Sequence, residues 1–303
     1  MRKTACLLLC GLTLLLQACS TTRLGYDHLD TVMRWVLTDY VDLEQPQDRI
    51  WQREFPALWD WHRHTQLPLY AADLRQLAGQ ARQGPLSYEQ LHQVSERITT
   101  HWHTTIEHIL PAFAALNASF GDEQVAELVK NIGAKIDKKG RKRHKYSDHE
   151  RRERLTDETD SLLRKWLGSV EEPQKKLVAQ WVAQTPLIGP RDTADQHQLL
   201  DQYAALLQHR HEPGLETGLH ALILRPDDPN APPSRNPAER ERRLHLLADI
   251  SATLNQEQRD HLADKLNGYA EDFEVLAAES AAQAKANADK GDAEAKPQAA
   301  PES

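Results

Sequence analysis

Histidine is the residue type that most directly suggests chemistry in this chain, because fifteen are present and two pairs have the spacing of metal ligands. His101 and His103 form one pair, and His209 and His211 form the other. Positions two apart on a helix point to different faces, and neither pair has a third ligand at a spacing that completes a site. We therefore expect no metal site.

Carboxylates are abundant, but the spacings that identify catalytic sites are missing. The chain contains no Gly-x-Ser-x-Gly elbow, no His-Glu-x-x-His motif, no phosphate-binding glycine loop and no dinucleotide fingerprint. A hydrolase with two carboxylates remains an alternative, because folding can bring distant acids together. We expect a protein that is not an enzyme and has no cofactor.

A basic run stands out in a chain whose formal net charge is −8. Its field would attract lipid phosphates, lipopolysaccharide or acidic segments of other proteins, and added salt would weaken that attraction. The alternative is a solvated loop at Gly140 whose charges serve solubility alone. The candidate contact residues are Lys138, Lys139, Arg141, Lys142, Arg143 and Lys145, with Arg151, Arg152 and Arg154 close behind.

The N-terminus carries an export signal. Arg2 and Lys3 precede an apolar run of about ten residues, which is too short for a bilayer that needs about twenty. The next residues, Leu16, Gln17, Ala18 and Cys19, resemble the lipobox of bacterial lipoproteins. We therefore predict that a signal peptidase recognises Leu16 and Ala18, removes residues 1–18 and leaves a lipidated Cys19. The alternative is an ordinary secretory signal with a cysteine there by chance.

The predicted processing also indicates where in the cell the protein is located. Cys19 is the one cysteine of the mature chain, so no internal disulfide can form. Several acyl chains bury many methylene groups and hold a protein on its membrane. Ser20 follows, whereas aspartate there usually accompanies retention in the inner membrane, so we expect the periplasmic face of the outer membrane. The acidic mature chain argues against binding to nucleic acid.

The elements around these residues are helices, since apolar positions recur at three and four and no strand alternation is present. We predict an all-α fold of antiparallel hairpins, arranged as an open cradle or an irregular bundle. Two stripes near the N-terminus are expected to pack on each other, and Trp35 lies off the first stripe. The stripes are Leu29, Val32, Met33, Val36 and Tyr40, and Trp51, Phe55, Leu58, Trp59 and His62.

One way of starting a helix recurs along the chain. An apolar residue precedes a capping residue, and glutamine follows three positions after the cap, as in a capping box with a hydrophobic staple. Unequal intervals between the copies argue against a solenoid. The copies are Leu86-Ser87-Tyr88-Glu89-Gln90, Phe120-Gly121-Asp122-Glu123-Gln124 and Leu254-Asn255-Gln256-Glu257-Gln258, with a weaker one at Val170-Glu171-Glu172-Pro173-Gln174.

The C-terminal part predicts a final amphipathic helix and a tail. Leu262, Leu266, Tyr269, Phe273 and Leu276 form an apolar face that should return to the core. From residue 282 the chain lacks large apolar residues and should be disordered. The predicted organisation is thus a signal peptide over residues 1–18, a helical domain over 19–281 and a tail over 282–303.

Residues in the N-terminal block resemble an uncharacterised family of Gram-negative lipoproteins, the domain of unknown function 6279. The resemblance covers the lipobox through roughly Trp181, and the family offers no established activity or site to carry over. Its residues are Gly25-Tyr26-Asp27, Arg34-Trp35, Asp39-Tyr40-Val41-Asp42-Leu43, Leu58-Trp59, Trp61-His62-Arg63, Thr65-Gln66-Leu67-Pro68 and Tyr70.

The helix starts at Leu86 and Leu254 are similar to the Leu-Thr-x-x-Gln starts of periplasmic chaperones, with serine and asparagine where threonine is usual. That resemblance implies binding of unfolded clients in a helical cradle. Two functional classes stay open. The first is a chaperone-like envelope protein that binds non-native chains, and the second is an adaptor that binds one native partner or anionic lipid.

Overall fold

The capped helix starts and amphipathic stripes produce an all-α structure, which a computed structural model describes for residues 20–227, 232 and 236–294. Every regular element in these ranges is helical, which confirms the predicted fold class. None of the helices in the described ranges is long and apolar enough to cross a membrane. The elements are α2 (Ser20–Asp27), α3 (Leu29–Thr38), α4 (Gln45–Trp61), the π-helical η1 (His62–Gln66), α5 (Leu67–Gln83), α6 (Tyr88–Ala118), α7 (Asp122–His144), α8 (Asp148–Leu167), α9 (Glu172–Gln184), α10 (Pro190–Gln208), α11 (Leu215–Ile223), α12 (Pro237–Ala252) and α13 (Gln256–Glu294).

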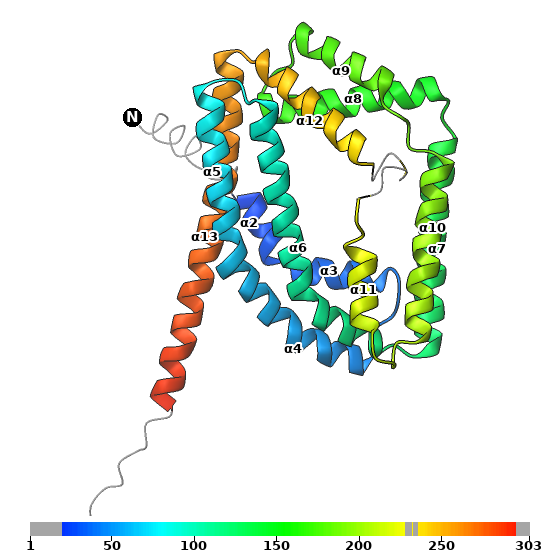
Figure 1. Cartoon of the computed structure of the whole chain (residues 1–303). Coiled ribbons are helices and arrows are strands. Elements are labelled where there is room, and N and C mark those ends of the chain that lie inside the picture. Colours follow the sequence, from blue (N-terminus) through cyan, green and yellow to red (C-terminus); the bar gives the residue numbers. More distant parts are fainter. Residues whose placement is uncertain (1–19, 228–231, 233–235, 295–303) are drawn as a thin grey trace, which may run out of the picture.

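Paired helices form the sides of a frame instead of one central bundle (Figure 1). One side is made by α5 and α13, the opposite side by α7 and α10, and the top by α8 and α9 with α12. Small residues at the α5–α13 contact allow the two backbones to approach closely, since Ala78, Ala263 and Ala270 are fully buried there. Buried apolar residues accordingly form separate clusters at the contacts between helices.

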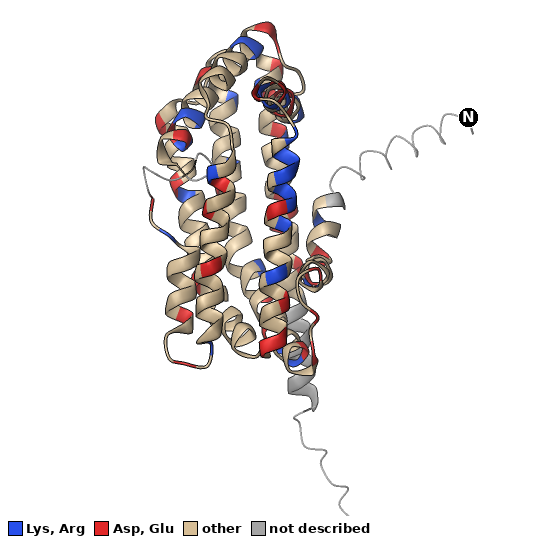
Figure 2. Ribbon diagram, turned by 90° about the vertical axis from the view of Figure 1, so that its right-hand side faces the viewer, with Lys and Arg blue, Asp and Glu red and all other residues tan. Residues whose placement is uncertain are grey.

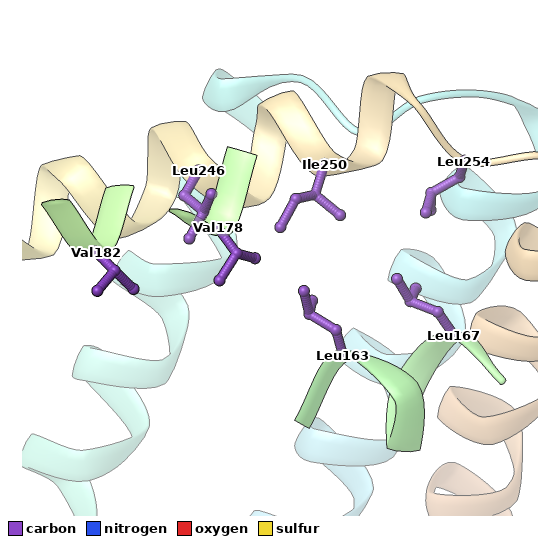
Figure 3. Packing of buried hydrophobic residues seen from close by; sticks show 7 residues of the cluster. All are labelled: Leu163, Leu167, Val178, Val182, Leu246, Ile250 and Leu254. Atoms are coloured by element: carbon purple, nitrogen blue, oxygen red, sulfur yellow. The ribbon is translucent and has the colours of Figure 1, made fainter. Parts of the chain in front are cut away.

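The cluster at the top of the frame joins three helices (Figure 3). Leu163 and Leu167 of α8 and Val178 and Val182 of α9 point towards residues of α12. Val178 is fully buried, and burying a side chain of this size stabilises the fold by about 1.5–3 kcal/mol. The α12 residues are Leu246 and Ile250, with Leu254 just after the helix.

Glutamines at the helix starts cap their own helices. At each of five described starts, the glutamine Oε1 accepts a hydrogen bond from the backbone N–H of the residue before the helix. One of these starts, Leu43-Glu44-Gln45-Pro46-Gln47, is absent from the copies recognised in the sequence, although it matches the Val170 copy in carrying proline before the glutamine. The glutamines are Gln47, Gln90, Gln124, Gln174 and Gln258.

Four of these glutamines also bind one another in two pairs. Gln174 Nε2 donates to Gln258 Oε1 at 3.0 Å, and Gln258 Nε2 donates back to Gln174 Oε1 at 3.1 Å. Gln47 and Gln124 make the same reciprocal pair at 3.4 and 3.3 Å. Each pair ties together two helix starts that are distant in sequence, with buried amides that satisfy each other.

The second predicted stripe forms an aromatic column on α4. Trp51 stacks on Phe55 at 4.6 Å between ring centroids, and Trp59 stacks on Tyr26 of α2 at 4.2 Å. At the end of the column the Tyr26 hydroxyl and His62 Nδ1 share a hydrogen bond of 2.6 Å. Burial lowers the pKa of His62 to about 4, so this imidazole is neutral at pH 7.

The first predicted stripe does not pack as expected. No residue of α3 is buried, and Val32, Met33 and Val36 are exposed, so the expectation that the two N-terminal stripes cover each other is wrong. Arg34 of α3 instead donates to Asp48 of α4 at 2.6 Å. A polar contact thus takes the place of the predicted apolar one.

The C-terminal helix follows the prediction in its first half. Leu266 and Leu276 of α13 are buried, which confirms that this apolar face returns to the core. The helix then continues to residue 294, beyond residue 282 where the sequence predicts a disordered tail. Residues 295–303 lie outside the described ranges.

Candidate protein-binding pocket

The basic run lies in the last turns of α7 (Figure 2). The expected break at Gly140 is wrong, because α7 continues through this residue to His144. Gly140 is buried against α10, and a Cβ atom there would lie 3.2 Å from Thr193 Oγ1. The glycine therefore permits close packing of two helices and does not form a loop. After Lys145 the chain turns, and the Ser147 side chain caps α8.

A pocket of about 510 Å³ lies beside the end of α7. It is bounded by the start of α8, the segment between α9 and α10, and the start of α12. Five cationic and two anionic side chains contribute to its lining, together with an apolar wall. The lining residues are Lys142, Arg143, Tyr146, Arg151, Arg154, Leu155, Glu158, Trp181, Thr185, Pro186, Leu187, Ile188, Glu239 and Arg243.

Some cations at this pocket hold its walls in place. Arg151 Nη1 donates to the Ile188 carbonyl at 2.9 Å, which ties α8 to the segment before α10. Arg152 donates to the carbonyls of Val182 and Thr185 and thereby caps the C-terminal end of α9. Arg152 thus satisfies carbonyls at the end of α9, and Arg151 holds the segment that follows, so both build the site's geometry.

Other cations are available for a ligand. Lys142, Arg143 and Arg243 line the pocket and form no ion pair with any described residue. Arg154 lies over the Tyr146 ring, 4.4 Å from its centroid. The rim is therefore a positive surface with an aromatic face, suited to carboxylate or phosphate groups.

The apolar wall is the outer edge of the cluster in Figure 3. Leu155 and Trp181 line the pocket and also pack against that buried cluster. Leu187 and the exposed Ile188 extend the wall towards α10. An apolar side chain from a bound molecule would contact this surface while an acidic group met the rim.

Two buried polar atoms at the pocket have no hydrogen-bond partner among the described residues. They are the indole Nε1 of Trp181 and Oε2 of Glu239. Glu239 is 4% exposed, and its other oxygen pairs with Arg242. A buried acceptor without a donor is costly.

The structure divides the predicted contact residues into two groups. Lys142 and Arg143 line the pocket, whereas Lys138, Lys139, Arg141 and Lys145 do not. Five further lining residues are not predicted from the sequence, namely Trp181, Leu187, Ile188, Glu239 and Arg243. The run Arg240-Glu241-Arg242-Arg243 is a second basic signal in the sequence, but only tertiary structure brings α12 to the end of α7.

The remaining predicted site residues lie elsewhere. His101 Nε2 pairs with Asp73 Oδ2 at 2.8 Å, and His209 Nδ1 pairs with Glu212 at 2.8 Å. Within the described ranges, no three histidine, cysteine, aspartate or glutamate residues are grouped to hold a metal ion. Leu16, Ala18 and Cys19 lie outside those ranges, and Ser20 is the first residue of α2.

Comparison with known proteins gives a family and nothing more specific. The search of curated proteins found no match, and neither did the search of solved structures. The model described as "Family of unknown function (DUF6279)" matches residues 39–232, which begins later and ends later than the resemblance noted in the sequence. Because that match spans more than half of the chain, the protein belongs to the DUF6279 family.

Proposed function

We propose that this protein is a lipid-anchored envelope protein, held at the periplasmic face of the outer membrane, that binds segments of other proteins without covalent chemistry. The signal peptide and lipobox of residues 1–19 support the compartment. The observation that carries the binding function is the pocket at the end of α7. It joins a basic rim to an apolar wall in a protein whose net charge is negative.

The chemistry of the pocket favours protein segments over other ligands. An extended segment with an apolar side chain next to aspartate or glutamate would place the side chain against Trp181 and Ile188. Its carboxylate would then meet Lys142 or Arg143. Such patterns are common in non-native chains, which favours the chaperone-like class over an adaptor with one partner. The recurrent capped helix starts also support this class.

The test is suppression of aggregation by the mature chain with Cys19→Ala. Two unrelated denatured proteins are diluted into increasing amounts of it, and light scattering is followed at low and high salt. We expect suppression of both clients near stoichiometric ratio. High salt should weaken it, because the Debye length falls from about 10 Å at 0.1 M to about 3 Å at 1 M.

Two matched triple variants locate the binding surface. Lys142→Ala, Arg143→Ala and Arg243→Ala remove three charges from the pocket, whereas Lys138→Ala, Lys139→Ala and Arg141→Ala remove three charges from the same basic run outside it. We expect only the first variant to lose suppression. Equal loss of suppression in both variants would show that net charge alone acts. If the protein with its pocket unchanged suppresses aggregation of neither client, the chaperone-like class is contradicted. Cross-linking to one native protein in cells would then support the adaptor.

A further inference from the structure

The outward side of α3 is an apolar surface on a helix that has no fully buried residue. Trp35 is 67% exposed, and Val32, Met33 and Val36 are 45%, 43% and 43% exposed. At 100° per residue, these four side chains fall within an arc of about 160° on the helix. We call them the apolar face of α3.

The opposite side of α3 is mainly polar and is turned towards the protein, where half-buried Leu37 packs against a core cluster. Arg34 donates to Asp48 of α4. Asp30, Thr31 and Thr38 border a hollow whose far wall is Trp51 and Phe55 of α4, and the largely exposed Trp35 also lines it. A surface helix of a soluble domain normally does the reverse, with its apolar side inward. Contiguous exposed apolar groups of this kind mark contact with a membrane or another protein.

The preceding helix, α2, is held against α4, η1 and α13. Besides the Tyr26 stack on Trp59, Asp27 of α2 pairs with Arg63 of η1, and Arg23 pairs with Asp272 of α13 at 3.2 Å. Ser20 is the first residue of α2, so the predicted lipidation site is the residue directly before this helix. The eight residues of α2 span about 12 Å, which separates the anchor from α3 by one short helix.

We infer that the apolar face of α3 lies in the interfacial layer of the membrane that carries the lipid anchor. This inference rests on the lipid attachment in the proposed function. Amphipathic helices lie about 5–10 Å deep in this layer, and tryptophan is enriched there. A lipid anchor alone leaves a protein free to turn, whereas a second contact through α3 fixes which side of the frame faces the membrane.

The test places a fluorescent probe on α3 in the full lipidated protein. Cys6 and Cys10 leave with the signal peptide and the thiol of Cys19 carries lipid, so a cysteine introduced by Val36→Cys is the single reactive thiol. The matched control is Leu162→Cys on α8, where the exposed fraction of the native side chain is 56% against 43% for Val36. Both labelled proteins are reconstituted in vesicles of phosphatidylethanolamine and phosphatidylglycerol with and without brominated lipid.

We expect quenching by brominated lipid at position 36 to exceed that at position 162 by about threefold or more, as for a probe at interfacial depth. Protein that floats with the vesicles but shows equal, weak quenching at both positions would overturn the α3 contact and leave lipid attachment intact. A blue shift at position 36 that depends on protein density, without quenching by lipid, would identify a second copy as the occupant and overturn the proposal. Failure of the protein to float would overturn both lipid attachment and the α3 contact.

Discussion

Replacing Gln258 with alanine should destabilise the protein far more than loss of a helix cap. Its Oε1 accepts from Asn255 N–H at 3.1 Å and from Gln174, and its Nε2 donates to the Ser169 carbonyl at 3.1 Å and to Gln174. Gln258 is 1% exposed and Gln174 is fully buried, so the Gln174 amide cannot turn to water when Gln258 is removed. Leaving a buried polar group unsatisfied costs about 1–3 kcal/mol. Here both ends of the buried Gln174 amide lose a partner and the helix cap on Asn255 N–H is lost as well, so we expect a loss of roughly 3–4 kcal/mol.

The reciprocal geometry predicts strong coupling between the two glutamines. Once Gln258→Ala has removed both mutual hydrogen bonds, Gln174→Ala has less to lose, so the double variant should cost about 1–3 kcal/mol less than the sum of the single variants. Urea unfolding of the mature chain with Cys19→Ala, followed by circular dichroism and tryptophan fluorescence, measures all four free energies.

Gln90 provides the matched control for this cycle. It caps α6 by accepting from Ser87 N–H at 2.8 Å, but it pairs with no other glutamine among the described residues. Gln90→Ala should therefore cost about 1 kcal/mol, the usual worth of a helix cap. The reasoning is refuted if Gln258→Ala costs no more than Gln90→Ala, or if the single losses at Gln174 and Gln258 simply add.

Three other predictions concern acid, glycine and lipid. Between pH 6.5 and about 4, His62 is protonated in the unfolded chain but not in the folded chain. Acid should therefore lower the free energy of unfolding by roughly 1–2 kcal/mol after allowance for partial exposure. His62→Phe should lose this part of the acid sensitivity, and an unchanged pH profile of stability would exclude the mechanism. Gly218→Ala should lower the melting temperature because the new Cβ atom would overlap Leu206. Gly268→Ala should stabilise the fold by about 0.5–1 kcal/mol, because no atom lies within 4 Å of the new Cβ. A change of stability in the same direction at both sites would contradict this. Cys19→Ala should abolish lipid labelling and release the protein from the membrane, and persistent attachment would refute lipid anchoring.

Helices could be predicted from the sequence because their signals are local. Apolar residues recur within a few positions, and the capping residues Ser87 and Asn255 lie next to the helices that they start. The glutamine pairs could not be predicted in the same way. Their partners are 77 and 84 residues apart, and nothing near either residue specifies the other. A glutamine that caps a helix has the same sequence pattern whether or not it also pairs with a glutamine at another helix start.

The pocket was predictable in part, for a related reason. The basic run made Lys142 and Arg143 visible, but the apolar wall and Arg243 reach the site only through the packing of α8, α9 and α12. At Gly140 a local signal in the sequence predicts a structure that tertiary packing overrides. Its low helix propensity favours a break, yet close packing against Thr193 outweighs a local cost of about 1 kcal/mol.

The orientation of α3 shows why hydrophobic periodicity alone does not predict what a helix packs against. Periodicity shows that one side of a helix needs an apolar surrounding, but both the protein core and a membrane can supply it. The polar side decides between them, because the Arg34–Asp48 contact turns that side towards α4. The residues that distinguish a core helix from a membrane-facing one are therefore its charged residues and their partners. Asp48 lies fourteen positions after Arg34, so a local pattern in the sequence does not reveal this contact. Exchanging both residues for alanine in the labelled protein should free α3 to turn and reduce the lipid quenching at position 36.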